Sequence, residues 1–135
     1  MLALPPLPER DVLLLTPSFH VSTGQAYSWL DATSSGQLPS PVAIPLAALS
    51  DWNALAACAE NDFEVPVTSR HPEIAEMLAA LSRAGALVAR MSGSGSTVFG
   101  VFSDAALLRD FAGDERWEVR RTRSLGHVVP AEVTE

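Results

Sequence analysis

The hydrophobic and polar positions of the chain alternate between the two-residue repeat of a strand and the longer repeat of a helix. A short apolar run over 11–16, closed by Pro17, predicts a largely buried strand. Helical spacing follows, and we expect a helix that begins at Ser22 or Thr23 and continues to about Ala32. Both hydroxyl residues are suitable N-caps, because a side-chain oxygen can accept a free backbone N–H of the first turn.

Helical patterns continue through the middle of the chain. Residues 33–45 are rich in proline and serine and predict a loop open to motion. Residues 46–59 are rich in alanine and leucine, with a second helix start indicated at Ser50 and Asp51. A short helix containing Phe63 and Glu64 is expected next, capped by the two polar residues before it, Asn61 and Asp62.

The strongest helical stripe follows Pro72, a residue suited to the first turn of a helix. Four apolar residues recur there at the spacing of one buried helix face: Ile74, Met77, Leu78 and Leu81. Arg83 and Gly85 supply the signals that end such a helix. We therefore expect a helix over about 72–83 that packs against the core.

Beyond this helix the spacing becomes that of strands. Residues 86–91 and 97–102 predict two strands, joined by the glycine–serine loop 92–96. Two further elements complete the order: a helix begun by Ser103 or Asp104, with Leu107, Leu108 and Phe111 on one side and Gly113 at its end, and a half-exposed strand over 117–122.

The predicted order is strand, several helices, strand, strand, helix, strand. This order favours an α+β, ferredoxin-like fold: a split β-α-β antiparallel sheet with helices on one face, elaborated by extra helices after the first strand. We expect one domain over 11–124, an extended proline-containing lead-in over 1–10 and a loosely held tail over 125–135.

Composition and charge narrow the function. The 135 residues are 47% hydrophobic, which suits one compact domain. The longest strongly apolar run, Val12 to Leu15, is too short to cross a membrane, and the first residues lack the basic start of a signal peptide, so the cytoplasm is the default compartment. A net charge of −7 argues against a nucleic-acid partner. The one basic cluster, Arg116, Arg120, Arg121 and Arg123, is typical of a solvated strand face.

Several kinds of chemistry are excluded within this chain. All nine basic residues are arginines, so there is no lysine for a phosphate-binding loop or a Schiff base. His20, His71 and His127 lack the spacing of zinc ligands, and His71 is interpreted as a helix-entry residue. The one cysteine, Cys58, is interpreted as a small buried residue. We expect no metal site.

The loop Ser92-Gly93-Ser94-Gly95-Ser96 is the most informative string in the sequence. Small residues let backbone N–H groups approach an anion, and glycines adopt backbone angles that other residues avoid. Spacing alone favours a simple hairpin connector. The loop is no dinucleotide fingerprint, because Val98 stands where a third glycine would be needed.

Residues 71–102, which include this loop, resemble the third conserved motif of the GHMP kinases. Residues 12–31 resemble the strand and helix that open the C-terminal domain of these enzymes, and Asn61-Asp62-Phe63-Glu64 matches a further motif. The resemblance covers roughly residues 8–123. It is closest to the members that phosphorylate a cytidine-diphosphate-linked methylerythritol in non-mevalonate isoprenoid biosynthesis.

The resemblance implies roles for particular residues. Loop residues 92–96 would support and shape the triphosphate site rather than transfer protons. Thr23 and Tyr27 match a threonine and an aromatic residue that line a cytidine pocket, where the Tyr27 ring would stack on cytosine. Two alternatives stay open: Tyr27 as a core-facing helix residue and Thr23 as an N-cap only.

This sequence also differs from the family's pattern, and the differences bear on its function. Its catalytic lysine and aspartate and its main ATP loop belong to an N-terminal domain, and the lysine and a second glycine–serine loop do not occur here. We therefore expect no catalytic residue in this chain, no kinase activity from it alone and no tightly bound cofactor, with ATP and Mg²⁺ used by a parent enzyme. The chain would be a cloned domain or a truncated gene product whose partner is the missing N-terminal domain.

Two alternatives remain. One is the C-terminal half of a different GHMP kinase with another substrate. The other is a non-catalytic binding or assembly module that kept the fold and dimerises through the face left uncovered.

Overall fold

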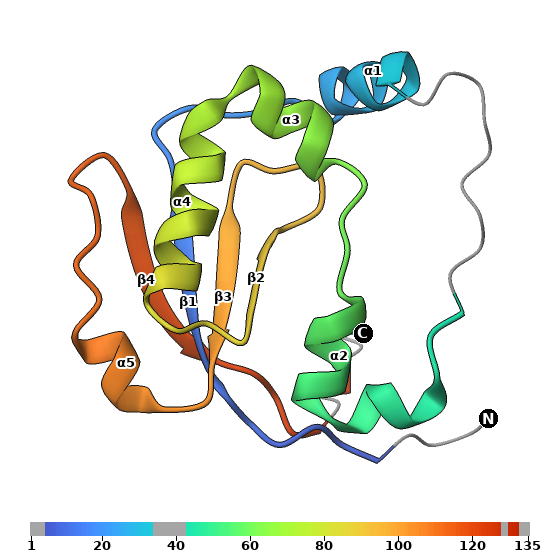
Figure 1. The fold of residues 1–135 in the computed structure, drawn as a ribbon, viewed down its shortest axis with the longest axis vertical. Coiled ribbons are helices and arrows are strands. Elements are labelled where there is room, and N and C mark those ends of the chain that lie inside the picture. Colours follow the sequence, from blue (N-terminus) through green and yellow to red (C-terminus); the bar gives the residue numbers. More distant parts are fainter. Residues whose placement is uncertain (1–4, 34–42, 128–129, 133–135) are drawn as a thin grey trace.

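The computed structural model describes residues 5–33, 43–127 and 130–132. Within them lies one four-stranded antiparallel sheet in the order β2-β3-β1-β4. Its strands are β1 (Asp11–Thr16), β2 (Val88–Met91), β3 (Val98–Phe102) and β4 (Glu118–Arg123). β1 and β3 are central, and β2 and β4 form the edges (Figure 1). The expected ferredoxin-like sheet is confirmed.

The described residues also form five α-helices and one 3-10 helix. They are α1 (Thr23–Thr33), η1 (Leu46–Ser50), α2 (Trp52–Cys58), α3 (Glu64–Arg70), α4 (Pro72–Arg83) and α5 (Ala105–Arg109). Figure 1 shows α4 lying across the sheet, with α3 and α1 at one end and α5 at the other. β1 and β2 run in the same direction, and β3 lies between them in the sheet. The extra helices that the sequence predicts connect β1 to β2 along the chain.

Strand register decides which side chains meet the helices. Leu13 pairs with Gly100 and Leu15 pairs with Val98, so these four residues share one face of the sheet. Leu13, Leu15 and Val98 are fully buried there. The alternate residues of β1 point to the opposite face, where Leu14 is only half-buried.

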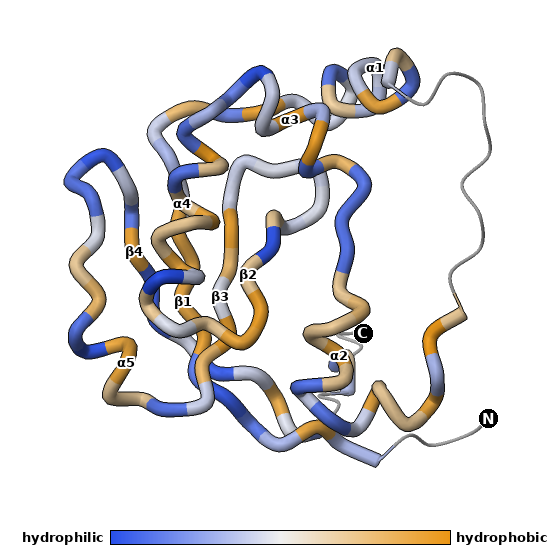
Figure 2. The backbone as a smooth tube through the Cα atoms, in the orientation of Figure 1, coloured by the Kyte–Doolittle hydropathy of each residue, from blue (hydrophilic) through white to orange (hydrophobic). Residues whose placement is uncertain are grey.

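The helices complete a single core against that face. Ile74, Met77 and Leu81 of α4 are fully buried, as is Phe102 at the end of β3. α1 contributes Ala26 and α3 contributes Val67 to the same cluster. β4 carries mainly hydrophilic residues, whereas hydrophobic residues are frequent in α4 and the other strands (Figure 2).

Gly100 allows α4 to approach the sheet closely. A Cβ atom added to Gly100 would lie 3.0 Å from Cδ2 of Leu81 and 3.2 Å from a ring carbon of Phe102. A larger residue at this position would therefore push the helix outward, since protein cores have little free volume.

The helix expected over 46–59 is divided in two. Asp51 separates η1 from α2, and its Oδ1 accepts the N–H of Asn53 at 2.9 Å. The fresh helix start predicted at this point is therefore confirmed for Asp51. Ser50 instead ends the 3-10 turn, where its hydroxyl donates to the Ala47 carbonyl at 3.1 Å.

Two sequence-based expectations near the C-terminus are wrong. α5 ends at Arg109 rather than near Gly113, because Phe111 leaves the helix to pack against the core. Gly113 serves a close approach instead: a Cβ there would lie 3.0 Å from Cγ2 of Val119. β4 is exposed along its whole length rather than half-exposed, since the helices pack mainly on β1, β2 and β3 rather than on β4.

The predicted loop over 33–45, the lead-in over 1–10 and the tail over 125–135 fall largely or partly outside the described residues. The described part of the lead-in is tied to α2, because the indole N–H of Trp52 donates to the Pro8 carbonyl at 2.6 Å. No helix in the described ranges is long and apolar enough to cross a membrane.

Candidate functional site

The glycine–serine loop closes the hairpin between β2 and β3. The N–H of Ser92 donates to the Thr97 carbonyl at 2.9 Å, and the N–H of Gly95 donates to the Ser92 carbonyl at 3.0 Å. Gly93 and Gly95 have φ angles of +55° and +89°. Residues with a Cβ rarely adopt such angles, so both glycines are required by the path of the loop.

Two adjacent N–H groups at the tip of this loop are not used by the loop itself. In the part of the chain that the structure describes, the amides of Gly93 and Ser94 donate to no protein acceptor. Gly93 is exposed and Ser94 half-buried. Free N–H groups at adjacent positions of a glycine-containing turn form a site that can bind an anion.

The N-terminus of α1 lies directly beside the loop. The hydroxyls of Thr23 and Ser94 are 3.3 Å apart, and the Ser96 hydroxyl donates to the Phe19 carbonyl at 3.0 Å. Ser22, not Thr23, caps α1, since its Oγ accepts the N–H of Gln25 at 3.1 Å. The side chain of Thr23 is therefore directed to the loop, and the reading of Thr23 as only an N-cap is wrong.

Tyr27 lies one turn further along α1, on its exposed side. Its side chain is 54% exposed, whereas the neighbouring Ala26 is fully buried. The Tyr27 ring meets the Phe63 ring edge-on, with ring centroids 5.0 Å apart. Tyr27 is thus a surface aromatic residue with one face available, and the core-facing alternative is wrong.

A groove of about 610 Å³ runs along the outer edge of β2 beside these two rings. Its walls come from α1, from the segment before α3, from β2 with the glycine loop, and from β3: Tyr27, Leu30, Ala59, Glu60, Asn61, Asp62, Phe63, Arg90, Met91, Gly93 and Phe99. The tertiary structure therefore gathers three segments that are far apart in the sequence. Tyr27 and Gly93, both expected site residues, line the same groove.

Sequence reasoning missed Arg90 as a groove residue. Arg90 stands opposite Phe99 in the β2–β3 register, and its Nε donates to the Ala59 carbonyl at 2.7 Å. It adds a positive charge to walls that also carry Glu60 and Asp62. The signal was weak, because a single arginine before a glycine loop looks like any strand residue.

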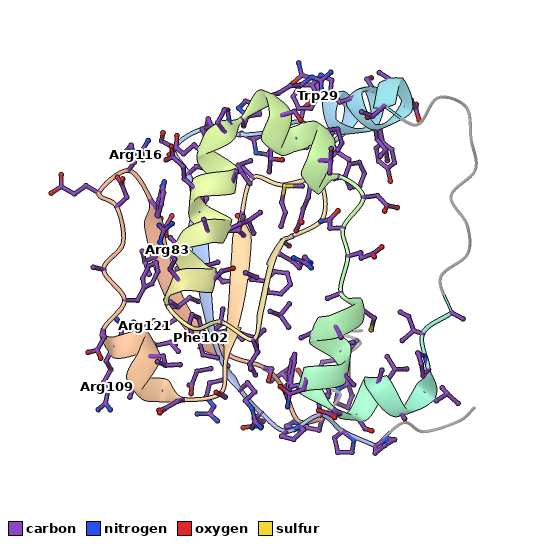
Figure 3. All side chains as sticks on the ribbon, in the orientation of Figure 1. Trp29, Arg83, Phe102, Arg109, Arg116 and Arg121 are labelled. Atoms are coloured by element: carbon purple, nitrogen blue, oxygen red, sulfur yellow. The ribbon has the colours of Figure 1, made fainter. Side chains whose placement is uncertain are left out.

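One arginine with several acidic partners lies elsewhere, where the loop before β4 meets α4. Arg116 contacts Asp114 at 2.9 Å and Glu76 at 3.0 Å. Hydrogen bonds from Arg116 hold the pKa of Asp114 below its usual value, and the same carboxylates raise the pKa of Arg116. Figure 3 places Arg116 on the β4 side of α4, away from Trp29 on α1. This cluster stabilises the surface and takes no part in the groove.

Other candidate residues occupy structural positions. His71 precedes α4, as expected of a helix-entry residue, and its ring stacks on Phe19 with centroids 4.6 Å apart. Cys58 ends α2 and is half-buried. Among the described residues, no group of three or more His, Cys, Asp and Glu side chains could hold a metal ion.

Comparison with known proteins agrees with the fold. Residues 43–117 match the family model described as the GHMP kinases C terminal. The chain is 42% identical over 110 residues to a 4-diphosphocytidyl-2-C-methyl-D-erythritol kinase of Rhizobium etli, covering 82% of this chain and 35% of the relative.

Two solved structures share the fold. One is a 4-(cytidine 5'-diphospho)-2C-methyl-D-erythritol kinase, with a TM-score of 0.59, 24% identity, and coverage of 86% of this chain and 44% of that one. The other is homoserine kinase from Cytophaga hutchinsonii, with a TM-score of 0.62, 16% identity, and coverage of 93% and 44%. The chain spans less than half the length of each of these three relatives.

Proposed function

Since residues 43–117 match their C-terminal domain, this chain belongs to the GHMP kinases, and we propose that it binds a cytidine-linked substrate and shapes an ATP site. The parent activity would be the ATP-dependent phosphorylation of a hydroxyl of 4-diphosphocytidyl-2-C-methyl-D-erythritol. The relative of that name, 42% identical to the chain, supports this choice of substrate.

One observation carries the proposal: the substrate-side residues and the glycine loop meet. The Thr23 and Ser94 hydroxyls are 3.3 Å apart, and Tyr27 and Gly93 line the same groove. A kinase must bring its acceptor and its phosphate donor together, and positioning supplies much of the rate acceleration in phosphoryl transfer. The contact between Thr23 and the glycine loop would place the acceptor and the phosphate donor next to each other.

The groove has chemistry suited to a pyrimidine. The open face of Tyr27 offers a stacking surface, and stacking of a base on an aromatic ring is worth about 1–3 kcal/mol. Phe63 holds the Tyr27 ring edge-on at 5.0 Å and so limits its rotation. Carboxylates and an arginine in the same walls can accept from and donate to the polar edge of the base.

The loop over 92–96 would face the phosphates of ATP. Its free N–H groups suit an anionic oxygen, and the glycines keep side chains out of the way. The chain supplies no lysine, and its net charge is −7, so the cations that neutralise the transferred phosphoryl group must come from elsewhere. We propose that a partner kinase domain and Mg²⁺ provide these cations and that ATP is the phosphate donor. We place the reaction in the cytoplasm, without nucleic acid or membranes as partners.

A titration with cytidine diphosphate tests the substrate assignment. In amide NMR spectra of the 135-residue chain, CDP is expected to shift Thr23, Tyr27 and their neighbours, whereas ADP is expected to shift residues 93–95. The Tyr27→Ala variant should bind CDP about tenfold or more weakly, since a stacking surface is lost. Val65→Ala, at another exposed apolar side chain (69% exposed), should bind CDP as the parent chain does.

The outcome that contradicts the assignment is equally specific. Equal CDP binding by the Tyr27→Ala and parent chains, or equal shifts with CDP and with homoserine, would remove the cytidine pocket. The second result would favour a different GHMP kinase, the alternative that the fold similarity to homoserine kinase supports.

A non-catalytic, dimerising module is the other alternative, and one feature favours it. Val12, Leu14 and Phe99 are half-buried on the sheet face opposite α4, and an uncovered apolar face favours association. Sedimentation of the chain separates the two proposals. A stable dimer that Leu14→Glu dissociates would favour the module, and a monomer would favour the kinase domain.

A further inference from the structure

The outer edge of β2 is closed by side chains rather than by another strand. β2 is an edge strand, so alternate residues direct their backbone N–H and C=O groups away from the sheet. At Met91 both groups are occupied. Its N–H donates to Oε1 of Glu64 at 2.8 Å, and its carbonyl accepts from Nδ2 of Asn61 at 2.7 Å. Asn61 and Glu64 therefore act together as a substitute for the missing neighbouring strand.

Asn61 makes a second contact that reaches into the glycine loop. Its Nδ2 also donates to the Gly93 carbonyl at 2.8 Å, while its Oδ1 accepts the N–H of Phe63 at 3.0 Å. The amide side chain thus connects the segment before α3 to both the end of β2 and the loop. A residue needed only to begin a helix would use the oxygen and leave the nitrogen free.

The contact with the Gly93 carbonyl fixes the direction of the next N–H group. The peptide bond between Gly93 and Ser94 is planar and trans, so its C=O and N–H point in opposite directions. Because Asn61 holds the Gly93 carbonyl, the Ser94 N–H is directed away from the segment before α3. The Ser94 N–H donates to no protein acceptor in the described residues.

The rest of the loop is held independently. The Ser94 hydroxyl lies 3.3 Å from that of Thr23, and the Ser96 hydroxyl donates to the Phe19 carbonyl. These contacts fix the side of the loop next to α1. Nothing on that side fixes the orientation of the Gly93–Ser94 peptide, which has Asn61 as its one side-chain partner among the described residues.

We propose that Asn61 is a positioning residue for the glycine loop: by holding the Gly93 carbonyl, it aims the Ser94 N–H at a phosphate oxyanion. Glu64 assists by fixing the Met91 N–H, which keeps the strand end and the loop in register with Asn61. The identification of the ligand as a phosphate rests on the proposed function. The hydrogen bond by which Asn61 holds the loop does not depend on it.

The Asn61→Asp variant distinguishes a positioning role of Asn61 from a helix-capping role. Asn61→Asp keeps an oxygen for the Phe63 N–H, and aspartate is as good a cap as asparagine. It removes both donated hydrogen bonds and sets a negative charge against two carbonyl oxygens. A capping role therefore predicts little change in this variant, and the positioning role predicts a loss of loop order.

The measurement is hydrogen exchange and N–H dipolar couplings of the loop amides in the 135-residue chain. Asn61→Asp is expected to speed exchange by about tenfold or more at Gly95, whose N–H is bonded to the Ser92 carbonyl across the turn, because two hydrogen bonds that hold the turn are lost, and to change the Ser94 coupling. Amides of α3 should keep their exchange rates. Glu64→Gln, which keeps a side-chain oxygen, should change the loop little. Asp62→Asn is the matched control, since Asp62 is exposed and makes no recorded contact with the loop.

Loop amides in Asn61→Asp that exchange and couple as in the parent chain would overturn the positioning role. A titration with inorganic pyrophosphate then examines the anion. The Ser94 amide of the parent chain is expected to shift, and that of Asn61→Asp is not. If the parent amide does not shift while Asn61→Asp still disorders the loop, the phosphate assignment in the proposed function is wrong and the positioning role of Asn61 stands.

Discussion

The two glycines of the loop over 92–96 tolerate an added side chain to different degrees. Gly93 and Gly95 are both in a five-residue loop and both have positive φ angles, yet their surroundings differ. A Cβ on Gly93 would meet open space, whereas one on Gly95 would lie 2.9 Å from the sulfur of Met91. Met91 is itself fixed, since Asn61 and Glu64 hold its backbone. The loop is therefore tightest at its second glycine.

Gly95→Ala is expected to destabilise the chain by about 1–3 kcal/mol, because alanine pays a backbone strain at φ +89° and meets Met91. Thermal or urea unfolding measures the change. Gly24→Ala is the matched control: Gly24 lies in α1, has no atom within 4 Å of an added Cβ, and should leave stability equal or slightly higher. Equal stability of the two variants would contradict the strain assigned to Gly95.

Among the elements, α4 does most to join the helices to the sheet. Pro72 begins it, and its buried residues Ile74, Met77 and Leu81 face β2 and β3. Its N-terminal turn also reaches the segment before β4, because the indole N–H of Trp117 donates to Glu73 at 2.9 Å. α4 thus joins the two edges of the sheet, and damage to its buried face should affect the whole domain.

Leu81→Ala should lower the free energy of unfolding by about 2–5 kcal/mol, since it removes a fully buried side chain and leaves a cavity above Gly100. Chemical denaturation gives this value. Val65→Ala, at an exposed position of α3, should change it by less than about 0.5 kcal/mol. A loss at Leu81 no greater than that at Val65 would show that α4 is not tightly packed on the sheet.

At the scale of the whole molecule, the chain has the fold of a GHMP kinase C-terminal domain, and few of its cations lie near the candidate site. Its groove and loop are the parts that we propose bind and position the substrates, and the core beneath them is continuous. Arg90 is the one cation among the groove residues, and the chain carries sixteen acidic residues against nine basic ones.

The purified 135-residue chain is therefore expected to transfer no phosphate from ATP to 4-diphosphocytidyl-2-C-methyl-D-erythritol, because phosphoryl transfer depends on cations and on a positioned nucleophile. A coupled assay for ADP release measures this, with a full-length relative as the positive control. ADP release that requires the cytidine substrate and is lost in Tyr27→Ala would contradict the expectation and place catalytic groups within this chain.

The sequence by itself determined the elements and their order, because apolar spacing and capping depend only on residues that are close together along the chain. The strand over 11–16, the helix after Pro72 and the break at Asp51 all follow from such patterns, and together they were enough to predict the sheet. Prediction was weaker where burial depended on distant neighbours. Phe111 left its helix, and β4 was exposed on both faces, because tertiary packing decides which apolar residues find partners.

The tertiary structure alone decided the site. Nothing in the sequence places Tyr27, Asn61, Arg90 and Gly93 in one groove, since contacts between distant segments depend on how the strands pair and where α1 and α3 pack. It also decided what each polar atom does. The sequence offered Asn61 as a helix cap, but the N-cap of α3 is Phe63, which has no side-chain cap hydrogen bond. The Asn61 oxygen accepts the Phe63 N–H in the turn before α3 and its nitrogen holds the loop, a division that only three-dimensional geometry could make.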